Sequence, residues 1–393
     1  MNGIHVPRRE LFRVSAAAAI GAALPARALA LAEEPPPSIA ALQPRTEGIA
    51  PISLDERRAR LQRAQALLRA SGLDALVMAT GSSLEYFTGA LWGLSERFFG
   101  AVVTREGDPA WVTPAFEKER ALEQIKLGAD VRAWEEEQSP SELVAAILRD
   151  RKVATGRVGV DEAMPFAFAD AMAKAAPTAR FESGTPVTAG CRMVKDAHEI
   201  AILRRICEIT MQAHRAVFAA LREGMTQEQA AALCVQAHRQ LGVRGGALVL
   251  FGKDAAFPHG TTRPQPLKPG DVVLVDGGGE LFGYASDISR TLVFGAPPTD
   301  RQRQVWDLVR HAQDAAFRAV KPGVECQAVD AAARKVLEDG GFGPGYRYLT
   351  HRLGHGIGLD GHEYPYMVRG NRTRLAPGMC FSNEPGIYVY GEL

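Results

Sequence analysis

A run of three histidines and four glycines between His351 and Glu363 is the segment most able to do chemistry. Histidine is the commonest metal ligand and a natural acid or base near neutral pH. Glycines between histidines let the backbone bend sharply and approach a bound group closely. The run, which contains His355 and His362, therefore predicts a site of metal binding or acid–base catalysis.

Three carboxylates outside this run complete a candidate metal centre. Asp276 and Asp287 lie upstream, eleven positions apart, and Glu384 lies downstream in an Asn-Glu-Pro-Gly sequence. Two aspartates, a histidine and a glutamate form the hard, oxygen-rich ligand set that suits paired divalent metals. Asp276 alone could cap a turn and Asp287 alone could pair with Arg290, but their combination with the histidine run favours a two-metal hydrolase.

A β-hairpin is expected to position the two aspartates. Residues 271–276 predict a buried strand ending in Asp276, and the three glycines after it allow a tight turn with close backbone approach. Residues 284–292 predict the returning strand, so that Asp276 and Asp287 can converge. His259 follows a strand predicted at 247–251 and is a further candidate, because a histidine in a loop is more often functional than one in a helix.

Amphipathic helices are predicted around these strands, from Lys195, at 226–241, at 300–319 and at 327–338. We interpret the histidines in helical patterns as surface or core-edge residues, and not as ligands: His198, His214, His238 and His311.

Residues 53–186 predict a separate three-layer α/β domain, because strand and helix patterns alternate along them. Ser53 caps the first helix, which ends at Gly72. We interpret the Gly-Ser-Ser sequence at 81–83 as a turn and not as a phosphate-binding loop. This domain shows no chemistry of its own, and we expect it to shape the site or a subunit contact.

The first residues are expected to direct export. Arg8 and Arg9 precede a short apolar run and small-x-small sites, a pattern that resembles a twin-arginine signal peptide over residues 1–32. A disordered linker is predicted at 33–52. The expected location is therefore periplasmic or secreted, with no stable membrane anchor after cleavage.

The overall charge gives no sign of a polyanionic partner. The formal net charge is +1, from 46 basic and 45 acidic residues, so no nucleic acid is expected to bind. Five scattered cysteines without a CxxC pair argue against a disulfide framework and a zinc ribbon.

Taken in order, the Asp276, Asp287, His351–Glu363 and Glu384 motifs resemble the prolidase/aminopeptidase P family of metallopeptidases. The resemblance extends from about residue 53 to the end and is specific in the second half. It implies an N-terminal α/β domain at 53–186 followed by a pita-bread catalytic domain at 187–393. It also implies two divalent metal ions, with Mn²⁺ preferred over Co²⁺, Zn²⁺ or Fe²⁺, and a homodimer.

The same resemblance implies a role for each motif residue. The implied metal ligands are Asp276, Asp287, His355 and Glu384, with Asp287 bridging the two ions. The implied catalytic residues are His259 at the substrate, His351 at the proline side, His362 at the tetrahedral intermediate and Glu384 as proton carrier. The implied reaction is hydrolysis of the bond before proline, in a proline-containing peptide, by attack of a metal-bound hydroxide.

The sequence departs from the family pattern at one position. The family has a second bridging glutamate on a later strand, and Glu392 comes too early to be assigned to it. We therefore expect a C-terminally truncated sequence, in which a strand at 387–390 lacks its antiparallel partner. A non-catalytic pita-bread binding protein and a creatinase-like non-peptidase hydrolase are the alternative interpretations, and dipeptidase and aminopeptidase activity are not distinguished.

Overall fold

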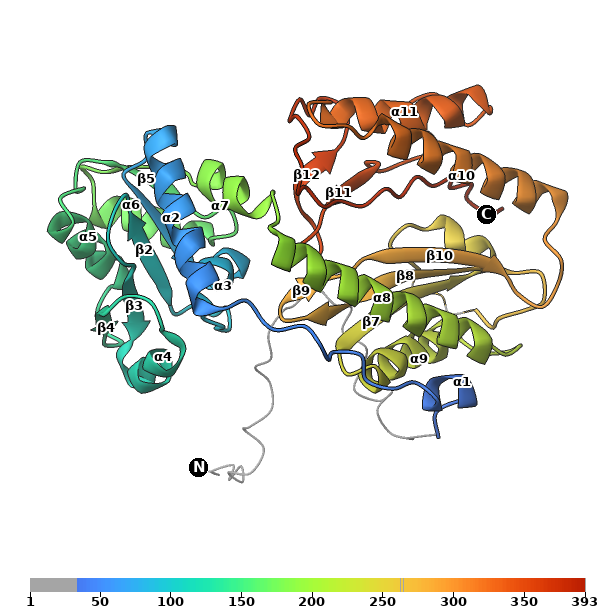
Figure 1. Cartoon of the computed structure of the whole chain (residues 1–393), viewed down its shortest axis with the longest axis horizontal. Coiled ribbons are helices and arrows are strands. Elements are labelled where there is room, and N and C mark those ends of the chain that lie inside the picture. The colour runs from blue at the N-terminus through green and yellow to red at the C-terminus, as the bar shows by residue number, and fades with distance from the viewer. Residues whose placement is uncertain (1–33, 262, 264, 393) are drawn as a thin grey trace, which may run out of the picture.

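The structure, a computed structural model, describes residues 34–261, 263 and 265–392 and consists of two α/β halves (Figure 1). The export signal predicted at residues 1–32 lies outside the described residues. Within the described ranges, none of the helices has the length and apolar character needed to cross a membrane.

The N-terminal half is a six-stranded mixed sheet with helices on both faces. Its strands are β1 (Ala75–Ala79), β2 (Gly100–Thr104), β3 (Ala110–Pro114), β4 (Asp130–Trp134), β5 (Arg157–Val160) and β6 (Arg180–Ser183). Its helices are α2 (Leu54–Ser71), α3 (Ser82–Thr88), α4 (Lys118–Gln124), α5 (Pro140–Asp150), α6 (Phe166–Ala175) and α7 (Thr185–Arg192), with a 3-10 turn η2 (Ala115–Glu117). Apolar residues of α2, α3 and α7 pack on one face of β1, and those of α5 and α6 pack on the other. The predicted three-layer α/β arrangement is confirmed.

Helix α2 begins where the sequence predicts a helix N-cap, whereas α3 begins where the sequence predicts a turn. Ser53 and Glu56 form a reciprocal capping box, and Gly72 ends α2 in a left-handed conformation. The turn predicted at residues 81–83 is wrong, because Gly81 is the N-cap of α3. Leu84 and Phe87, one helical turn apart, are both buried and explain why the chain continues as a helix there.

The C-terminal half contains two β-sheets between two pairs of helices (Figure 1). Its strands are β7 (Arg244–Phe251), β8 (Val272–Leu281), β9 (Tyr284–Ala285), β10 (Ile288–Val293), β11 (Gly354–Gly356) and β12 (Glu363–Met367). Its helices are α8 (Ala197–Ala220), α9 (Gln227–Gln240), α10 (Asp300–Ala319) and α11 (Cys326–Asp339), with a 3-10 turn η3 (Gly252–Ala256). Helices α8 and α9 cover the sheet β10-β8-β7, while α10 and α11 lie outside β11 and β12. The expected pita-bread arrangement is confirmed.

Strand β8 does not end at Asp276, as the sequence led us to expect, but continues through the three glycines to Leu281. The glycines allow close approach of neighbouring chains and do not form a turn. A Cβ on Gly277 would lie 2.4 Å from the carbonyl oxygen of Gly246 on β7. The reversal of the chain comes later, at Phe282 and Gly283, both of which have positive φ.

The linker predicted to be disordered at 33–52 is ordered over its described part, residues 34–52. It includes a short helix, α1 (Pro37–Ala40), and Ile39 is fully buried against the core of the C-terminal half. The Ser38 hydroxyl donates a hydrogen bond to the Ala216 carbonyl on α8 at 2.8 Å. Proline content suggested disorder, but Ile39 and Leu42 form an apolar face that α8 and α9 bury.

Two further expectations are also wrong. Residues 387–390 do not form a strand, and Ile387 packs into the core beneath α10 and α11. His214 and His238 are fully inside the molecule, and not at its surface or core edge. Burial lowers the pKa of His214 to about 4, so that its imidazole is neutral at physiological pH.

Candidate metal centre

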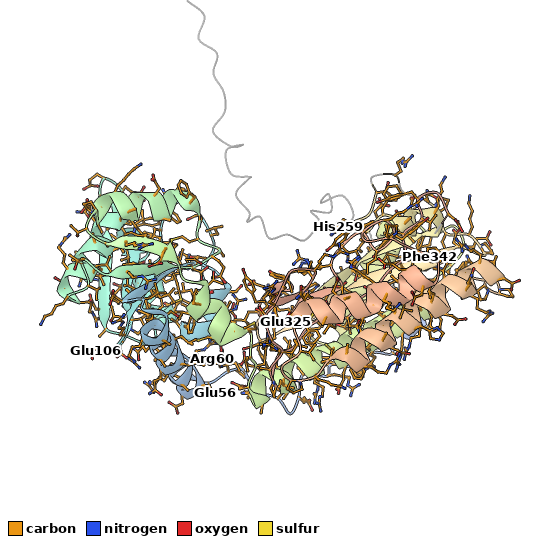
Figure 2. All side chains as sticks on the ribbon, turned by 90° about the horizontal axis from the view of Figure 1, so that it is seen from above. Glu56, Arg60, Glu106, His259, Glu325 and Phe342 are labelled. Carbon is orange, nitrogen blue, oxygen red and sulfur yellow. The ribbon has the colours of Figure 1, made fainter. Side chains whose placement is uncertain are left out.

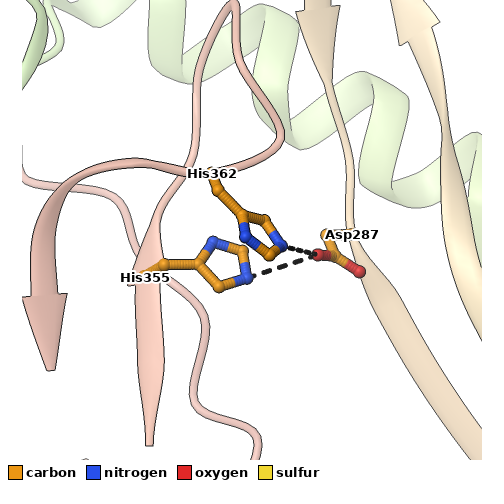
Figure 3. A group of neighbouring side chains, drawn as sticks. All are labelled: Asp287, His355 and His362. Atoms are coloured by element: carbon orange, nitrogen blue, oxygen red, sulfur yellow. Dashed lines mark ion pairs between the residues drawn. The ribbon is translucent and has the colours of Figure 1, made fainter. Parts of the chain in front are cut away.

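Four of the predicted site residues come into direct contact between the two sheets of the C-terminal half. The His355 Nε2 atom lies 3.4 Å from Asp287 Oδ2 and 3.0 Å from Glu384 Oε1. The His362 Nε2 atom lies 3.9 Å from Asp287 Oδ2. Figure 3 shows the two imidazoles side by side, both facing Asp287. Three chain segments that are distant in sequence therefore converge on one point.

The β8–β10 hairpin explains how the two aspartates reach this point. Ser289 pairs with Asp276, and Ile288 pairs with Gly277, so Asp287 stands near Gly278 on the same face of β8 as Asp276. A Cβ on Gly278 would lie only 1.6 Å from the Ser286 carbonyl oxygen. Glycine at 278 is therefore required for the chain carrying Asp287 to approach β8 this closely.

Hydrogen bonds fix the orientation of the His355 imidazole. Its Nδ1 lies 3.0 Å from the Gly356 carbonyl oxygen, which can only accept, so Nδ1 carries a hydrogen and Nε2 is the atom that faces the carboxylates. The Ser382 hydroxyl accepts from the His355 backbone N–H at 2.9 Å and donates to Glu384 Oε1 at 2.7 Å. One hydroxyl thus holds His355 and Glu384 in a common geometry.

The electrostatics of the cluster indicate an excess of negative charge. Burial raises the pKa of Asp276, and the nearby charges of Asp287 and Glu384 raise it further. Burial opposes protonation of His355, but its hydrogen bonds to Asp287 and Glu384 outweigh that effect and raise its pKa to about 10. Burial and the charge on His355 lower the pKa of His362. Three carboxylates are therefore grouped around one strongly polarised imidazole.

This donor set fits divalent cations. Ligand atoms of Asp287, His355 and His362 all lie within 4.8 Å of one another. Carboxylate oxygens together with a neutral imidazole suit hard or borderline divalent ions. The hydrogen bond from His355 Nδ1 to a backbone carbonyl is of the kind that typically orients a metal-binding histidine. Glu384 Oε1, 3.0 Å from His355 Nε2, adds a second carboxylate.

The structure places His351 and His259 beside this cluster and not within it. The His351 Nδ1 lies 2.6 Å from the Arg352 carbonyl oxygen, so its Nε2, 2.8 Å from Tyr388 Oη, accepts from that hydroxyl. His259 is exposed in the loop after η3 (Figure 2), whereas burial lowers the pKa of His351. Within the described chain, the His259 side chain has no ion pair with the cluster.

Hydroxyl groups that support the site were missed from the sequence. The Ser289 hydroxyl donates to Asp276, Ser382 connects His355 to Glu384, and Tyr388 donates to His351. Their only sequence signal is closeness to a motif residue, which many serines and tyrosines share by chance. The Glu392 carboxylate, which has no assigned role, pairs with Arg301 Nε at 2.9 Å.

Comparison with known proteins agrees with this geometry. Residues 201–392 match Metallopeptidase family M24, and residues 60–194 match the Creatinase/Prolidase N-terminal domain. The Xaa-Pro dipeptidase of Lactobacillus delbrueckii subsp. lactis is 34% identical over 84% of this chain and 90% of its own length. The probable dipeptidase PepE of Mycobacterium tuberculosis is 39% identical over 85% of this chain and 88% of its own.

A solved structure shows the same architecture over both halves. The dipeptidase PepE from Mycobacterium ulcerans superposes with a TM-score of 0.79 at 35% identity, covering 87% of this chain and 92% of that one. The identity and coverage of these relatives, and the matched domains, lead to one conclusion: the chain belongs to the M24 metallopeptidases that carry a creatinase/prolidase-type N-terminal domain.

Proposed function

We propose that this peptidase cleaves the bond before proline and holds two divalent ions with Asp276, Asp287, His355 and Glu384. The convergence of Asp287 and Glu384 on His355 Nε2, at 3.4 and 3.0 Å, is the observation that carries the proposal. The choice of substrate is supported by a relative that is named an Xaa-Pro dipeptidase. Three carboxylates that distinguish a metal-dependent site from a creatinase-like one are present, Asp276, Asp287 and Glu384, whereas the family's second bridging glutamate is not assigned in this sequence.

Divalent ions bound here supply Lewis-acid activation of water and of the scissile carbonyl. We propose Mn²⁺ as the preferred ion, because carboxylate-rich sites suit hard cations, with Co²⁺, Zn²⁺ or Fe²⁺ as substitutes. Asp287 lies beside His355 (Figure 3) and would be the carboxylate shared by the two ions, as the family resemblance implies.

We assign three side chains of the cluster separate roles in peptide hydrolysis. His362, whose lowered pKa keeps the imidazole neutral, donates a hydrogen bond to the substrate carbonyl oxygen as negative charge develops on it. Glu384 takes a proton from the attacking water and delivers it to the proline nitrogen as the C–N bond breaks. The Ser382 hydroxyl keeps the Glu384 carboxylate oriented during both transfers.

His351 and His259 are assigned to substrate binding. The Tyr388 hydroxyl donates to His351 Nε2 at 2.8 Å and fixes the imidazole edge beside the cluster. Proline lacks an amide N–H, so its ring can be held in a slot that offers no backbone acceptor. We assign that proline side to His351 and the approach of the substrate to His259.

The proposal is tested by metal content and peptide cleavage together. Protein reconstituted with Mn²⁺ is analysed for bound metal and assayed on Xaa-Pro peptides and matched Xaa-Ala peptides. We expect two ions per chain and cleavage confined to the proline series. His355→Gln should lose both, whereas His311→Gln, an exposed histidine on α10, should lose neither.

Three outcomes would contradict the proposal. Full activity of metal-free protein would show that catalysis does not depend on metal ions bound by the cluster. Equal cleavage of the Xaa-Ala series would remove the substrate assignment. One ion per chain with full activity would show that the four ligands serve a single metal.

We also propose export through the twin-arginine signal at residues 1–32 and assembly as a homodimer. Export rests on the Arg8-Arg9 pair and the apolar run that follows. Replacing both arginines by lysine should retain the protein in the cytoplasm. Sedimentation of the mature chain tests the dimer, and a monomer at working concentration would contradict it.

A further inference from the structure

A buried ionic cluster lies where the N-terminal half meets the segment that carries His362. We infer that Arg192 and Lys195 position His362 by forming ion pairs with the carboxylate of its neighbour, Glu363. We call these two ion pairs the Glu363 clamp. Because His362 meets the substrate only in the Xaa-Pro peptidase proposed above, the inference rests on that function. Arg192, Lys195 and Glu363 do not themselves touch substrate and are positioning residues.

The backbone geometry connects Glu363 to His362. Glu363 begins β12, where adjacent side chains point to opposite sides. Its side chain is 7% exposed and faces the junction between the halves, whereas that of His362 is 62% exposed and faces Asp287. Any displacement of the Glu363 carboxylate therefore moves the peptide that holds the His362 imidazole.

Two cations hold the Glu363 carboxylate from both sides. Lys195 Nζ lies 2.6 Å from Oε1, and Arg192 Nη2 lies 2.5 Å from Oε2. The Lys195 side chain is only 1% exposed, so its charge has no access to water as a substitute partner. Charge-assisted bonds of this length in a water-free setting fix a side chain strongly.

The N-terminal half also holds the same loop on the other side of His362. Arg192 Nη2 lies 2.5 Å from Asp360 Oδ2, and the Ser82 hydroxyl on α3 donates to the other Asp360 oxygen. Arg192 Nη1 donates to the Ser83 hydroxyl at 3.3 Å. His362 thus lies between two acidic residues; α7 contacts both of them through Arg192, and α3 contacts Asp360 through Ser82.

Gly358 shows that the loop is shaped for this contact. A Cβ there would lie 2.5 Å from Glu363 Oε1, so only glycine lets the carboxylate fold back over the loop. The Gly358 carbonyl accepts from the Ala285 N–H at 2.8 Å, two residues before Asp287. The Glu363 clamp is therefore continuous with the hairpin that carries a metal ligand.

Stability alone is a poor reason for such a cluster. Burying the two cations together with the Glu363 carboxylate carries a desolvation cost that apolar residues of similar size avoid. Positioning of His362 explains the presence of this buried cluster, because a small misplacement of a catalytic group can lower the rate on the order of 100-fold. The residues that the sequence left without a function, in the N-terminal half and in its connection to α8, then contribute directly to the geometry of the site.

The test uses Glu363→Gln and Lys195→Met in the full mature chain, with Lys335→Met as control. Lys335 forms an exposed pair with Asp339 on α11, remote from this cluster in sequence. Hydrogen–deuterium exchange on metal-free protein reports on residues 356–363 without any need for activity. We expect faster exchange there in both cluster variants, unchanged exchange in the rest of the C-terminal half, and no change in the control.

Kinetics on an Xaa-Pro dipeptide give a second readout. Glu363→Gln should lower kcat on the order of 100-fold with little change in KM. In a His362→Ala background, Glu363→Gln should cause no further loss, because both changes remove the same contribution. A purely structural role would instead give losses that multiply.

Either readout can overturn the inference. Unchanged exchange at 356–363, or multiplying losses with His362→Ala, would contradict it. Wild-type protein that does not cleave Xaa-Pro peptides would contradict the proposed function, while the exchange experiment still tests the Glu363 clamp. If Glu363→Gln fails to fold, Asp360→Asn carries the same test, because the Asp360 side chain is 44% exposed.

Discussion

In the N-terminal half, β1, β2 and β3 are buried along their whole length, whereas in the C-terminal half β8 alternates between buried and half-buried positions. Helices cover both faces of the first sheet. In the second sheet, Val273 and Val275 pack against α8 and α9, and the intervening positions, Asp276 among them, face the opposite sheet.

The difference shows where each half can place polar groups. A strand that is covered on both faces must be apolar along its length, which leaves no position for a metal ligand. A strand with one open face can alternate, with valine holding the core and aspartate facing the cleft. The N-terminal sheet is therefore a scaffold, and two helices on one of its faces, α3 and α7, contact the loop that carries His362.

The largest loss of activity is expected from a substitution on the face of β8 and β10 that helices do not cover. Asp287→Asn keeps the size of the side chain but removes one charge from the cluster around His355. A lost metal ligand removes several kcal/mol of transition-state stabilisation, so kcat/KM should fall on the order of 1000-fold. Steady-state assays and metal analysis check this, with the exposed Asp339→Asn as control. Full activity in Asp287→Asn would show that the open face is not the reactive one.

A substitution in the N-terminal sheet, which helices cover on both faces, should lower stability and leave activity unchanged. Leu76 on β1 is fully buried, and Leu76→Ala should lower the free energy of unfolding by about 2–5 kcal/mol while folded molecules keep their kcat. Ile39→Ala, also in a fully buried position, should cost a similar amount through the core of the C-terminal half. Urea denaturation followed by circular dichroism measures both.

Peptide-resolved hydrogen exchange separates these two variants. Leu76→Ala should raise exchange in the N-terminal sheet, whereas Ile39→Ala should raise it in α8 and α9, although residue 39 precedes both halves. Increased exchange of β1 in Ile39→Ala would show that the segment at 34–52 belongs to the N-terminal half.

Sequence reasoning identified residues that the structure brings together, because the chemistry proposed for them needs few residue types. Asp287, His355, His362 and Glu384 each stand in a glycine- or proline-containing motif, and the structure brings them together. Strands β1, β2 and β3 of the scaffold were also predictable, since each is a short apolar run between turns, whereas β4 and β6 contain charged residues and were not predicted. Both signals are local, and each can be read within about ten residues.

Long-range contacts could not be predicted in this way. The glycines after Asp276 predicted a turn, but what they permit is the approach of β7 and Ser286, which only the assembled sheet reveals. Lys195 and Glu363 are 168 positions apart, and nothing around either residue identifies the other as its partner. Proline content at 35–37 suggested disorder, because the apolar surface of α8 and α9 that buries Ile39 is not visible locally.

The smallest effect, on the free energy of unfolding, is expected for a substitution at the connection between the two halves. His198 on α8 hydrogen-bonds Glu56 on α2, with Nδ1 2.6 Å from Oε1, and Figure 2 shows Glu56 at this connection. That bond raises the pKa of His198. Burial of Glu56 opposes ionisation, but hydrogen bonds from Ser53 and His198 outweigh it and lower its pKa to about 2.

These shifts define a pH window for the pair. The depressed pKa of Glu56 gives stability that is present above 4.5, its unfolded value, and is lost as the pH falls towards about 2. The raised pKa of His198 gives stability that is present below 6.5 and is lost as the pH rises through its folded value. Glu56→Gln, which preserves the capping box, should therefore cost about 1 kcal/mol at most, with its maximum between pH 4.5 and 6.5. Urea titrations at pH 3, 5.5 and 8 against Asp55→Asn on the same helix measure it, and a cost that is equal at all three values would show that the connection between the halves does not depend on this charge pair.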